Sequence, residues 1–444
     1  MEIPKKYDHQ KRVVILGAGF AGLTLAKRLS AKYFQVILLD KNNYHQFQPL
    51  LYQVATSGLE PSSISFPLRK IFQKKKNVII RLTSVTGVSP ERKKVHTEIG
   101  DIEFDYLILA QGATTNYYNN DSLHNNAYSM KSVSEALLLR NNLLQNYELA
   151  LNPMNREERN SLLNVVIVGG GPTGVELAGA IAEMKSKILP KDYAELNFGH
   201  MHIYLLEAGS NLLNGMSNKS GETVLAYLKR LGVEVQTNTA VKNYDGETVQ
   251  LSNGKTISSR NLIWAAGVKG VTIPGIPTNS VATNNRLIVD HNNKVSGLQD
   301  VYAIGDIAFM KDEKYLKGHP QVAQVAIQQA NLLAKNLLRN ETGKPLCAFS
   351  YNDKGSMATV GRNLAVAEIG KLKMKGFFAW FVWMMVHLMS IIGIKNRFLI
   401  LINWIWQYIT YDQSLRLIIK PNLKKETNEK DITNTIEHKS FAGL

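Results

Sequence analysis

The sequence predicts an α/β fold in two similar halves, followed by a pair of apolar C-terminal helices. Two glycine-rich loops, at residues 17–22 and 169–174, each lie between a short apolar run and a helical pattern. Residues 377–394 carry no formal charge and precede a basic break. Short buried strands that alternate with helices are typical of parallel α/β sheets.

The composition fits a globular protein of several domains with a basic surface. The chain has 444 residues, 45% of them hydrophobic, and a formal net charge of +16. Such an excess favours anionic partners, among them lipid head groups and acidic small molecules. We expect no nucleic-acid partner. The polar start of the chain lacks an apolar signal core, so we also expect no export.

Cysteine usage excludes several redox mechanisms. The chain has one cysteine, Cys347, which cannot form a disulfide framework, an iron–sulfur cluster or a paired-thiol redox centre within one chain. We find no cluster of metal-ligating residues and expect no metal site.

The first loop has the features of a dinucleotide-binding turn. The apolar run 13–16 leads into Gly17, Gly19 and Gly22, and a second apolar run ends in Asp40. The first glycine permits a tight turn, the second lets a pyrophosphate approach, and the third allows close helix–strand packing. The acid can accept hydrogen bonds from ribose hydroxyls. The alternative is an ordinary glycine-rich βα turn.

The second loop repeats this pattern. The run 165–168 precedes Gly169, Gly171 and Gly174, and a later strand ends in Glu207. No arginine closely follows Glu207, and an acid there repels a 2′-phosphate, so NADH is favoured over NADPH. Two Rossmann-like dinucleotide-binding domains in one chain suggest FAD and NADH, because hydride transfer between them needs no protein acid or base.

Three further stretches carry a resemblance to a known family. Residues 104–115 and 261–270 are each an apolar strand followed by Ala-x-Gly, and residues 300–308 end a strand in Gly-Asp. With the two loops, in this order, they resemble the two-dinucleotide-binding-domain flavoproteins. The resemblance implies that the first loop, Gly112, Gly305 and Asp306 hold FAD, and that the second loop and Gly267 hold NADH. It also implies that Asp306 bonds the ribityl chain and that a helix beginning there faces the flavin diphosphate.

Residues 42–61, 320–330 and 387–412 look like type II NADH:quinone oxidoreductases, the single-subunit, non-pumping NADH dehydrogenases. That resemblance implies that Gln324 and Gln328, four apart on one helix face, lie near the flavin where the quinone head group docks. A polar helix surface is the alternative. Glu176 matches a family acid that positions a substrate or serves a proton route; the alternative is a first-turn acid stabilised by the helix dipole.

The C-terminal stretch has the features of a membrane anchor. As one helix, residues 377–394 would span about 27 Å, and residues 398–411 only about 21 Å, too short to return across a ~30 Å core. One helix face carries the polar residues Asn396, Asn403, Gln407, Thr410 and Ser414. Four of the five tryptophans lie here, and we expect them at the membrane interface: Trp380, Trp383, Trp404 and Trp406. We predict two helices lying in one leaflet. A buried core pair, a dimer interface and a single span are the alternatives.

We therefore predict an FAD domain in two parts, 1–118 and 282–370, with an NADH domain, 119–281, inserted. Amphipathic anchor helices at 371–419 and a polar tail at 420–444 follow. The predicted activity is hydride transfer from NADH to FAD and electron transfer to a membrane quinone, without proton pumping. The predicted location is the cytoplasmic face of the cell inner membrane, with a homodimer possible. The alternatives are a reductase of a soluble electron carrier and a low-turnover flavin and NADH sensor.

Overall fold

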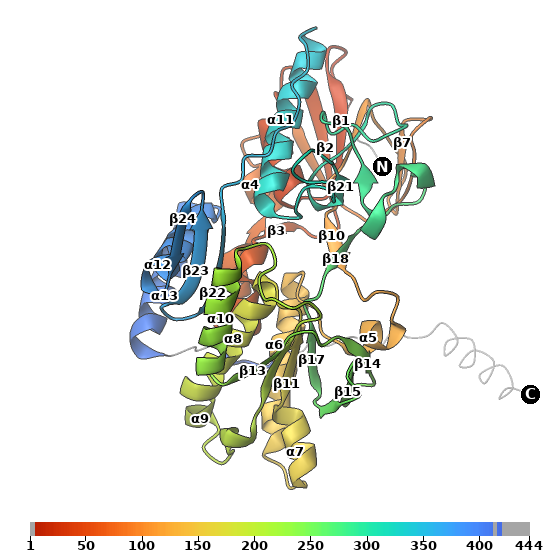
Figure 1. Ribbon diagram of the computed structural model, residues 1–444. Helices are drawn as coiled ribbons and strands as arrows, with labels where there is room; N and C mark the ends of the chain where they lie inside the picture. The colour runs from red at the N-terminus through yellow and green to blue at the C-terminus, as the bar shows by residue number, and fades with distance from the viewer. Residues whose placement is uncertain (1–4, 412–414, 420–444) are drawn as a thin grey trace, which may run out of the picture.

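Two parallel sheets of similar topology form the frame of the molecule (Figure 1). The computed structural model describes residues 5–411 and 415–419. The predicted α/β class is confirmed. Each sheet has helices on one face and a small antiparallel sheet on the other, so the central strands are buried on both sides.

The first sheet has the order β20-β9-β1-β2-β5, with all four pairs parallel. Its strands are β1 (Lys11–Leu16), β2 (Phe34–Asp40), β5 (Val78–Leu82), β9 (Tyr106–Leu109) and β20 (Val301–Ala303). One face packs on helices α1 (Phe20–Arg28) and α11 (Ala323–Glu341). The other packs on the sheet of β6 (Val85–Ser89), β7 (Lys94–Thr97) and β8 (Ile102–Glu103).

The second sheet repeats the arrangement in the order β13-β12-β11-β17. Its strands are β11 (Val165–Val168), β12 (Ile203–Leu206), β13 (Val233–Gln236) and β17 (Asn261–Trp264). One face carries α6 (Val133–Ala150), α8 (Pro172–Lys187) and α10 (Asn218–Arg230). The other carries β14 (Val241–Tyr244), β15 (Thr248–Leu251) and β16 (Thr256–Ser258). An antiparallel pair, β10 (Ala113–Thr115) and β18 (Val268–Gly270), joins the two halves.

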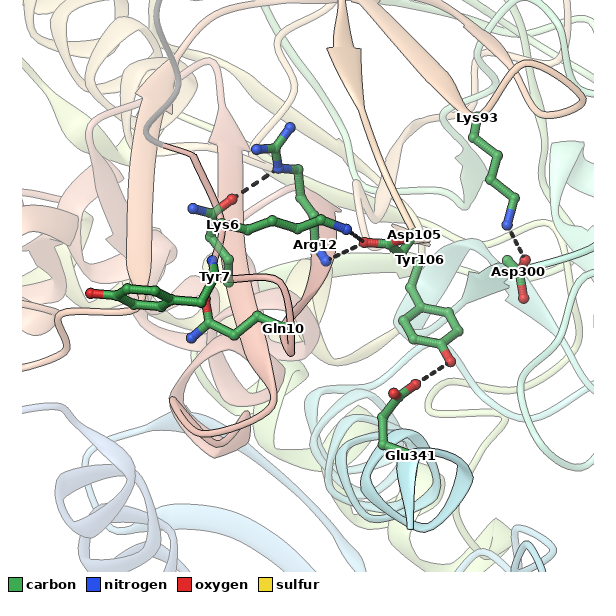
Figure 2. A network of polar contacts seen from close by, with 10 residues as sticks. Lys6, Tyr7, Gln10, Arg12, Lys93, Asp105, Tyr106, Asp300 and Glu341 are labelled. Atoms are coloured by element: carbon green, nitrogen blue, oxygen red, sulfur yellow. Dashed lines mark hydrogen bonds and ion pairs between the residues drawn. The ribbon is translucent and has the colours of Figure 1, made fainter. Parts of the chain in front are cut away.

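Polar contacts between segments far apart in sequence hold the first half of the molecule together. Figure 2 shows Asp105 accepting hydrogen bonds from the Arg12 backbone N–H, at 2.6 Å, and from Lys6. In the same view the Tyr106 hydroxyl donates to Glu341 on α11 at 2.6 Å. A salt bridge between Lys93 and Asp300, at 2.6 Å, holds the start of β20. Residues after 300 thus complete a sheet that the first 109 residues begin.

The C-terminal part begins with a three-stranded antiparallel sheet that packs on α8. It contains β22 (Ser356–Gly361), β23 (Leu364–Ile369) and β24 (Leu372–Lys375). Helices α12 (Phe377–Ser390) and α13 (Ile394–Thr410) follow and lie beside this sheet in Figure 1. The remaining elements are short: α2 (Leu51–Ala55), α3 (Pro61–Ile64), α4 (Leu68–Ile71), α5 (Asp121–Asn126), α7 (Arg156–Leu163), α9 (Leu189–Asp192), β3 (Tyr44–Gln46), β4 (Ser65–Pro67), β19 (Leu287–Ile288), β21 (Ala308–Phe309) and five 3₁₀ turns.

The two anchor helices differ in length from the prediction. The first ends at Ser390, because Ile391 is extended and Gly393 has a φ of 86°, so the run to residue 394 is not one helix. The second begins at Ile394, four residues earlier than expected. Among the residues that the structure describes, no helix combines the length and the apolar character that a membrane crossing needs. Ser414 and the predicted tail from residue 420 lie outside the described residues.

Candidate functional site

The first glycine loop is shaped by two close backbone contacts. Gly17 follows β1 with a φ of 99°, and a Cβ there would lie 2.5 Å from the carbonyl oxygen of Ala110. A Cβ on Gly22 would overlap the Gly17 carbonyl oxygen. Side chains at these two positions are therefore excluded, and α1 begins directly against the end of β1.

The second loop has the same geometry. Gly169 has a φ of 114°, and a Cβ there would lie 2.7 Å from the carbonyl oxygen of Ala265. A Cβ on Gly174 would overlap the Gly169 carbonyl oxygen. Ala110 and Ala265 open the two Ala-x-Gly stretches, so each stretch supplies the backbone against which a glycine loop turns.

Both loops leave space for a diphosphate. Gly19 and Gly171 are the N-caps of α1 and α8, neither has a side-chain cap, and a Cβ on either would meet nothing within 4 Å. The free N–H groups at a helix N-terminus bind anions, and the helix dipole adds to the attraction. The residues present therefore fit two dinucleotides, one at each loop.

The acids after the second strands hold their own loops. Asp40 accepts from the backbone N–H of Ala18 at 2.6 Å and of Asn42 at 2.7 Å. Glu207 accepts from the backbone N–H of Gly170 at 2.6 Å and of Gly209 at 2.7 Å. Each carboxylate oxygen retains a lone pair that can accept a ribose hydroxyl.

The Gly-Asp segment lies at the helical face of the first sheet. Gly305 has a φ of 77°, and its N–H donates to Gln329 of α11 at 2.7 Å. The Asp306 carboxylate has no hydrogen bond or ion pair within the described part of the chain, and burial raises its pKa. A buried carboxylate without donors fits a ligand that brings hydroxyl groups, as a ribityl chain does. Gly112, with a φ of 74°, opens onto free space, whereas a Cβ on Gly267 would overlap the Tyr118 hydroxyl.

The helix expected at Asp306 is absent from that position. Residues Gly305–Ile307 form a single 3₁₀ turn, and α11 begins only at Ala323. The sequence signal at 305–306 marks a tight turn with positive φ, not a helix start.

The two glutamines of α11 share a helix face as predicted, and both are hydrogen-bonded to one backbone segment. Gln324 donates to the Gly355 carbonyl at 3.1 Å and accepts from the Lys354 N–H at 2.9 Å. Gln328 donates to the Asn352 carbonyl at 2.9 Å and accepts from its N–H at 3.0 Å. The glutamines thus fix the entry to β22.

A cavity of about 120 Å³ lies where α8 meets the C-terminal helices. Its walls come from four separate parts of the chain. They include Tyr52, Gln53, Thr56 and Gly58 around α2, Glu176, Ala180, Glu183 and Lys187 of α8, Thr359, Gly361 and Arg362 of the β22 hairpin, and Trp380, Trp383, Trp404, Gln407, Tyr408 and Tyr411.

Glu176 is the buried acid of this cavity, with 8% of its surface exposed. Burial raises the pKa of its carboxyl to about 8. Its Oε1 accepts long hydrogen bonds from the Thr359 N–H, at 3.5 Å, and from the Trp383 indole N–H, at 3.3 Å. The second oxygen, Oε2, has no hydrogen bond to any described residue. Burial therefore favours the protonated form of Glu176, and its carboxyl borders the cavity.

Comparison with known proteins identifies the family. The model of the pyridine nucleotide-disulphide oxidoreductases matches residues 11–330, and that of the NDH2 C-terminal domain matches residues 354–410. A type II NADH:quinone oxidoreductase of Mycobacterium tuberculosis is 36% identical over 88% of this chain and 87% of its own. The chain belongs to the type II NADH:quinone oxidoreductases.

Other members support this assignment. A type II NADH:quinone oxidoreductase of Haemophilus influenzae is 30% identical over 85% of this chain and 93% of its own. The structure of NDH2 from Plasmodium falciparum in complex with NADH superposes with a TM-score of 0.84, at 25% identity, over 92% of this chain and all of that one. The predicted family is confirmed.

Sequence reasoning missed most of the cavity of this type II oxidoreductase. Trp383 and Trp404 were expected at a membrane interface, but both are buried and donate inward, to Glu176 and to Gln53. Arg362 and Glu183 belong to no sequence motif that would mark them as residues of a cavity. An apolar helix that contains tryptophan signals either lipid or a core, and only the packing distinguishes them.

Proposed function

We propose that this protein is a membrane-associated flavoprotein that passes a hydride from NADH to FAD and two electrons onward to a membrane quinone, without pumping protons. One observation carries the proposal. The helix that begins at the second nucleotide loop also presents Glu176 to a cavity that the C-terminal helices close. A nucleotide site and an acid-bearing cavity beside the C-terminal helices therefore share one helix.

The nucleotide sites divide between the two halves. We assign FAD to Gly17, Gly19, Gly22, Asp40, Gly112, Gly305 and Asp306. We assign NADH to Gly169, Gly171, Gly174, Glu207 and Gly267. FAD supplies the chemistry of accepting a hydride and releasing electrons. The chain binds the diphosphates at two helix N-termini and turns both loops toward the β10–β18 junction.

A route for quinone is supported by the course of β22. Gln324 contacts Gly355, just before the strand begins, and the strand reaches the cavity at Thr359, about 13 Å from Gly355 at ~3.3 Å per residue. A head group that enters between α12 and α13 would pass Glu176 and approach the glutamines. Their amides can donate to a quinone carbonyl if they exchange their backbone partners.

The surface of α13 supports attachment to a bilayer. Its polar row, Asn396, Asn403 and Gln407, is half-buried against the protein, and most of its apolar residues other than Ile400 and Trp404 face outward. The exposed apolar side chains of both helices are Phe377, Phe378, Phe381, Met385, Val386, Met389, Ile394, Phe398, Leu399, Ile402, Ile405, Trp406, Tyr408 and Ile409. A helix with its apolar face outward is the reverse of a soluble surface helix and suits an interfacial anchor.

The membrane face, the domain limits and the oligomeric state are also proposals. We place the enzyme on the cytoplasmic face of the cell inner membrane and divide it at the predicted limits, 1–118, 119–281, 282–370 and 371–419. The pairing of β20 with β9 supports a first domain in two parts. The alternative is that α12 and α13 form the interface of a homodimer, which would bury the same apolar face.

An absorbance experiment tests the function. Purified protein should show a flavin band that bleaches when NADH is added without oxygen and returns when a lipophilic quinone is added. A protein that stays colourless after growth with ample flavin contradicts the proposal. Recovery only with a soluble redox protein would favour the carrier reductase, and bleaching without turnover would favour the sensor.

The role of the glutamines is tested separately. Gln324→Ala should slow quinone turnover about tenfold or more, because one hydrogen bond to the head group and the fixed entry to β22 are both lost. Bleaching by NADH should keep the native rate in stopped-flow absorbance. Equal slowing of both half-reactions would argue for a structural role only.

A further inference from the structure

A second acid lines the same cavity. Glu183 lies two helical turns after Glu176 on α8, and burial raises the pKa of its carboxyl. At 1.5 Å per residue the two positions are about 10 Å apart on one helix face. Between them lies Ala180, whose small side chain leaves the space open.

The placement of α8 makes this face part of the cavity wall. A Cβ on Gly179 would overlap the Val360 carbonyl oxygen of β22, so only glycine permits this contact. The hairpin therefore follows the helix closely, with Thr359 beside Glu176 and Gly361 beside Glu183. Both carboxyl groups face the narrow space between α8, β22 and the C-terminal helices.

The outer acid lies near the mouth of the cavity. Glu183 accepts a hydrogen bond from the Arg362 backbone N–H at 2.6 Å. The Arg362 guanidinium donates to the Gln407 and Tyr408 carbonyls and lies over the Tyr411 ring. The Lys187 ammonium also lies over that ring, 5.9 Å from its centroid. The charged and titratable groups that line the cavity around Glu183 are Arg362, Lys187, Tyr408, Tyr411, Glu176 and, from α2, Tyr52.

The stoichiometry of the proposed reaction requires one proton from water. NADH delivers a hydride, which is two electrons and one proton, and a quinone takes up two electrons and two protons to become a quinol. The second proton must reach a head group inside the protein. A cavity of about 120 Å³ can hold several water molecules, since one needs only ~10–15 Å³ of such volume.

We propose that Glu183 relays this proton from the mouth of the cavity, through water, to Glu176, which donates it to the quinone. The inference rests on the proposed function. Glu183 acts through Glu176 and is a positioning residue. Each transfer leaves a carboxylate that the next proton from water restores, so the relay returns to its starting state after every turnover.

Glu183→Gln tests the relay, because an amide keeps the volume and still accepts from the Arg362 N–H. We expect quinone-driven recovery of the flavin band to slow at least tenfold, with a larger solvent deuterium isotope effect. Small weak acids such as formic acid should restore the rate. Glu183→Asp, which keeps a titrating group, should retain most of it. Unchanged recovery, or slowing that weak acids do not rescue, overturns the relay.

A second readout needs no quinone. The protonated Glu176 carboxyl has an infrared C=O band, which is identified by its absence from Glu176→Gln. In D₂O this band shifts as the carboxyl proton exchanges for deuterium. We expect this exchange to slow in Glu183→Gln; an unchanged rate overturns the relay. Bleaching by NADH should be native in the variant. Native protein that does not bleach would refute the proposed function itself, so the two failures are distinguishable.

Discussion

Three carboxylates of this enzyme differ in the donors that surround them. Asp40 and Glu207 each accept two short backbone hydrogen bonds from the loops that they hold. Glu176 has only the two long bonds to its Oε1 and is buried. The first two are therefore suited to hold ribose hydroxyls, and the third is suited to carry a proton.

Glu176 should make the folded state sensitive to pH. Its pKa is about 8 in the fold and near 4.5 in the unfolded chain. Between these values the folded state holds a proton that the unfolded chain has lost, so the free energy of unfolding falls as pH rises and levels off above about 8. Glu176→Gln should flatten this decline, by up to about 1.4 kcal/mol per unit of pKa shift.

Thermal unfolding at pH 5 and pH 8.5 measures this effect. The difference in Tm between the two conditions should be smaller in Glu176→Gln than in the native protein. Glu195→Gln, on the exposed surface, is the control and should leave the difference unchanged. A variant that keeps the native pH dependence would show that Glu176 is ionised in the fold.

Glu207 should govern the choice of nucleotide. Glu207→Ala removes the acceptor for ribose hydroxyls, and we expect the KM for NADH to rise about tenfold, in line with ~1.4 kcal/mol for a lost charged hydrogen bond. The preference over NADPH should shrink, because the repulsion of a 2′-phosphate also disappears. Steady-state kinetics with both nucleotides measures this. Loss of bound flavin would instead contradict the assignment of this loop to NADH.

At the scale of elements, the contact between α8 and β22 joins the second half to the C-terminal part. It depends on Gly179, where a methyl group would overlap the Val360 carbonyl oxygen. Gly179→Ala should lower stability by about 2 kcal/mol or more, since backbone must shift to make room. Gly215→Ala is a matched control, because a Cβ there meets nothing within 4 Å. Equal Tm values for the two variants would refute the prediction.

For some elements, the local sequence pattern alone predicts where the element begins and ends. The strand at 165–168 was predicted to the residue, because a four-residue apolar run before a glycine has one plausible geometry in a parallel sheet. The helix ends near residue 391 were not predicted. Ile391, Ile392 and Gly393 continue an apolar run, so hydropathy alone does not reveal the break.

At the scale of the whole molecule, the outward apolar face of α12 and α13 should decide membrane attachment. Phe378 and Ile409 are 74% and 71% exposed. Glutamate at both positions should reduce sedimentation with phospholipid vesicles at least tenfold, because charge is costly at that depth. Turnover with a long-tailed quinone should fall, whereas turnover with a short-chain soluble quinone should remain.

Leu316→Glu, in a loop of the first half where Leu316 is also exposed, is the control and should bind vesicles normally. If the double variant still sediments with vesicles but changes from dimer to monomer in solution, the face is a subunit interface and not an anchor.

The sequence by itself determined the family, from motifs spread along the chain. It also determined the two glycine loops and the acids that follow them, because each acid lies within about 40 residues of its loop and the geometry of the loop is local. The cavity was decided only by the tertiary structure. Its walls come from residues 52–58, 176–188, 359–362 and 380–411. Whether Trp383 faces lipid or Glu176 depends on how α12 packs against α8, and burial, not sequence spacing, sets the proton affinity of that acid.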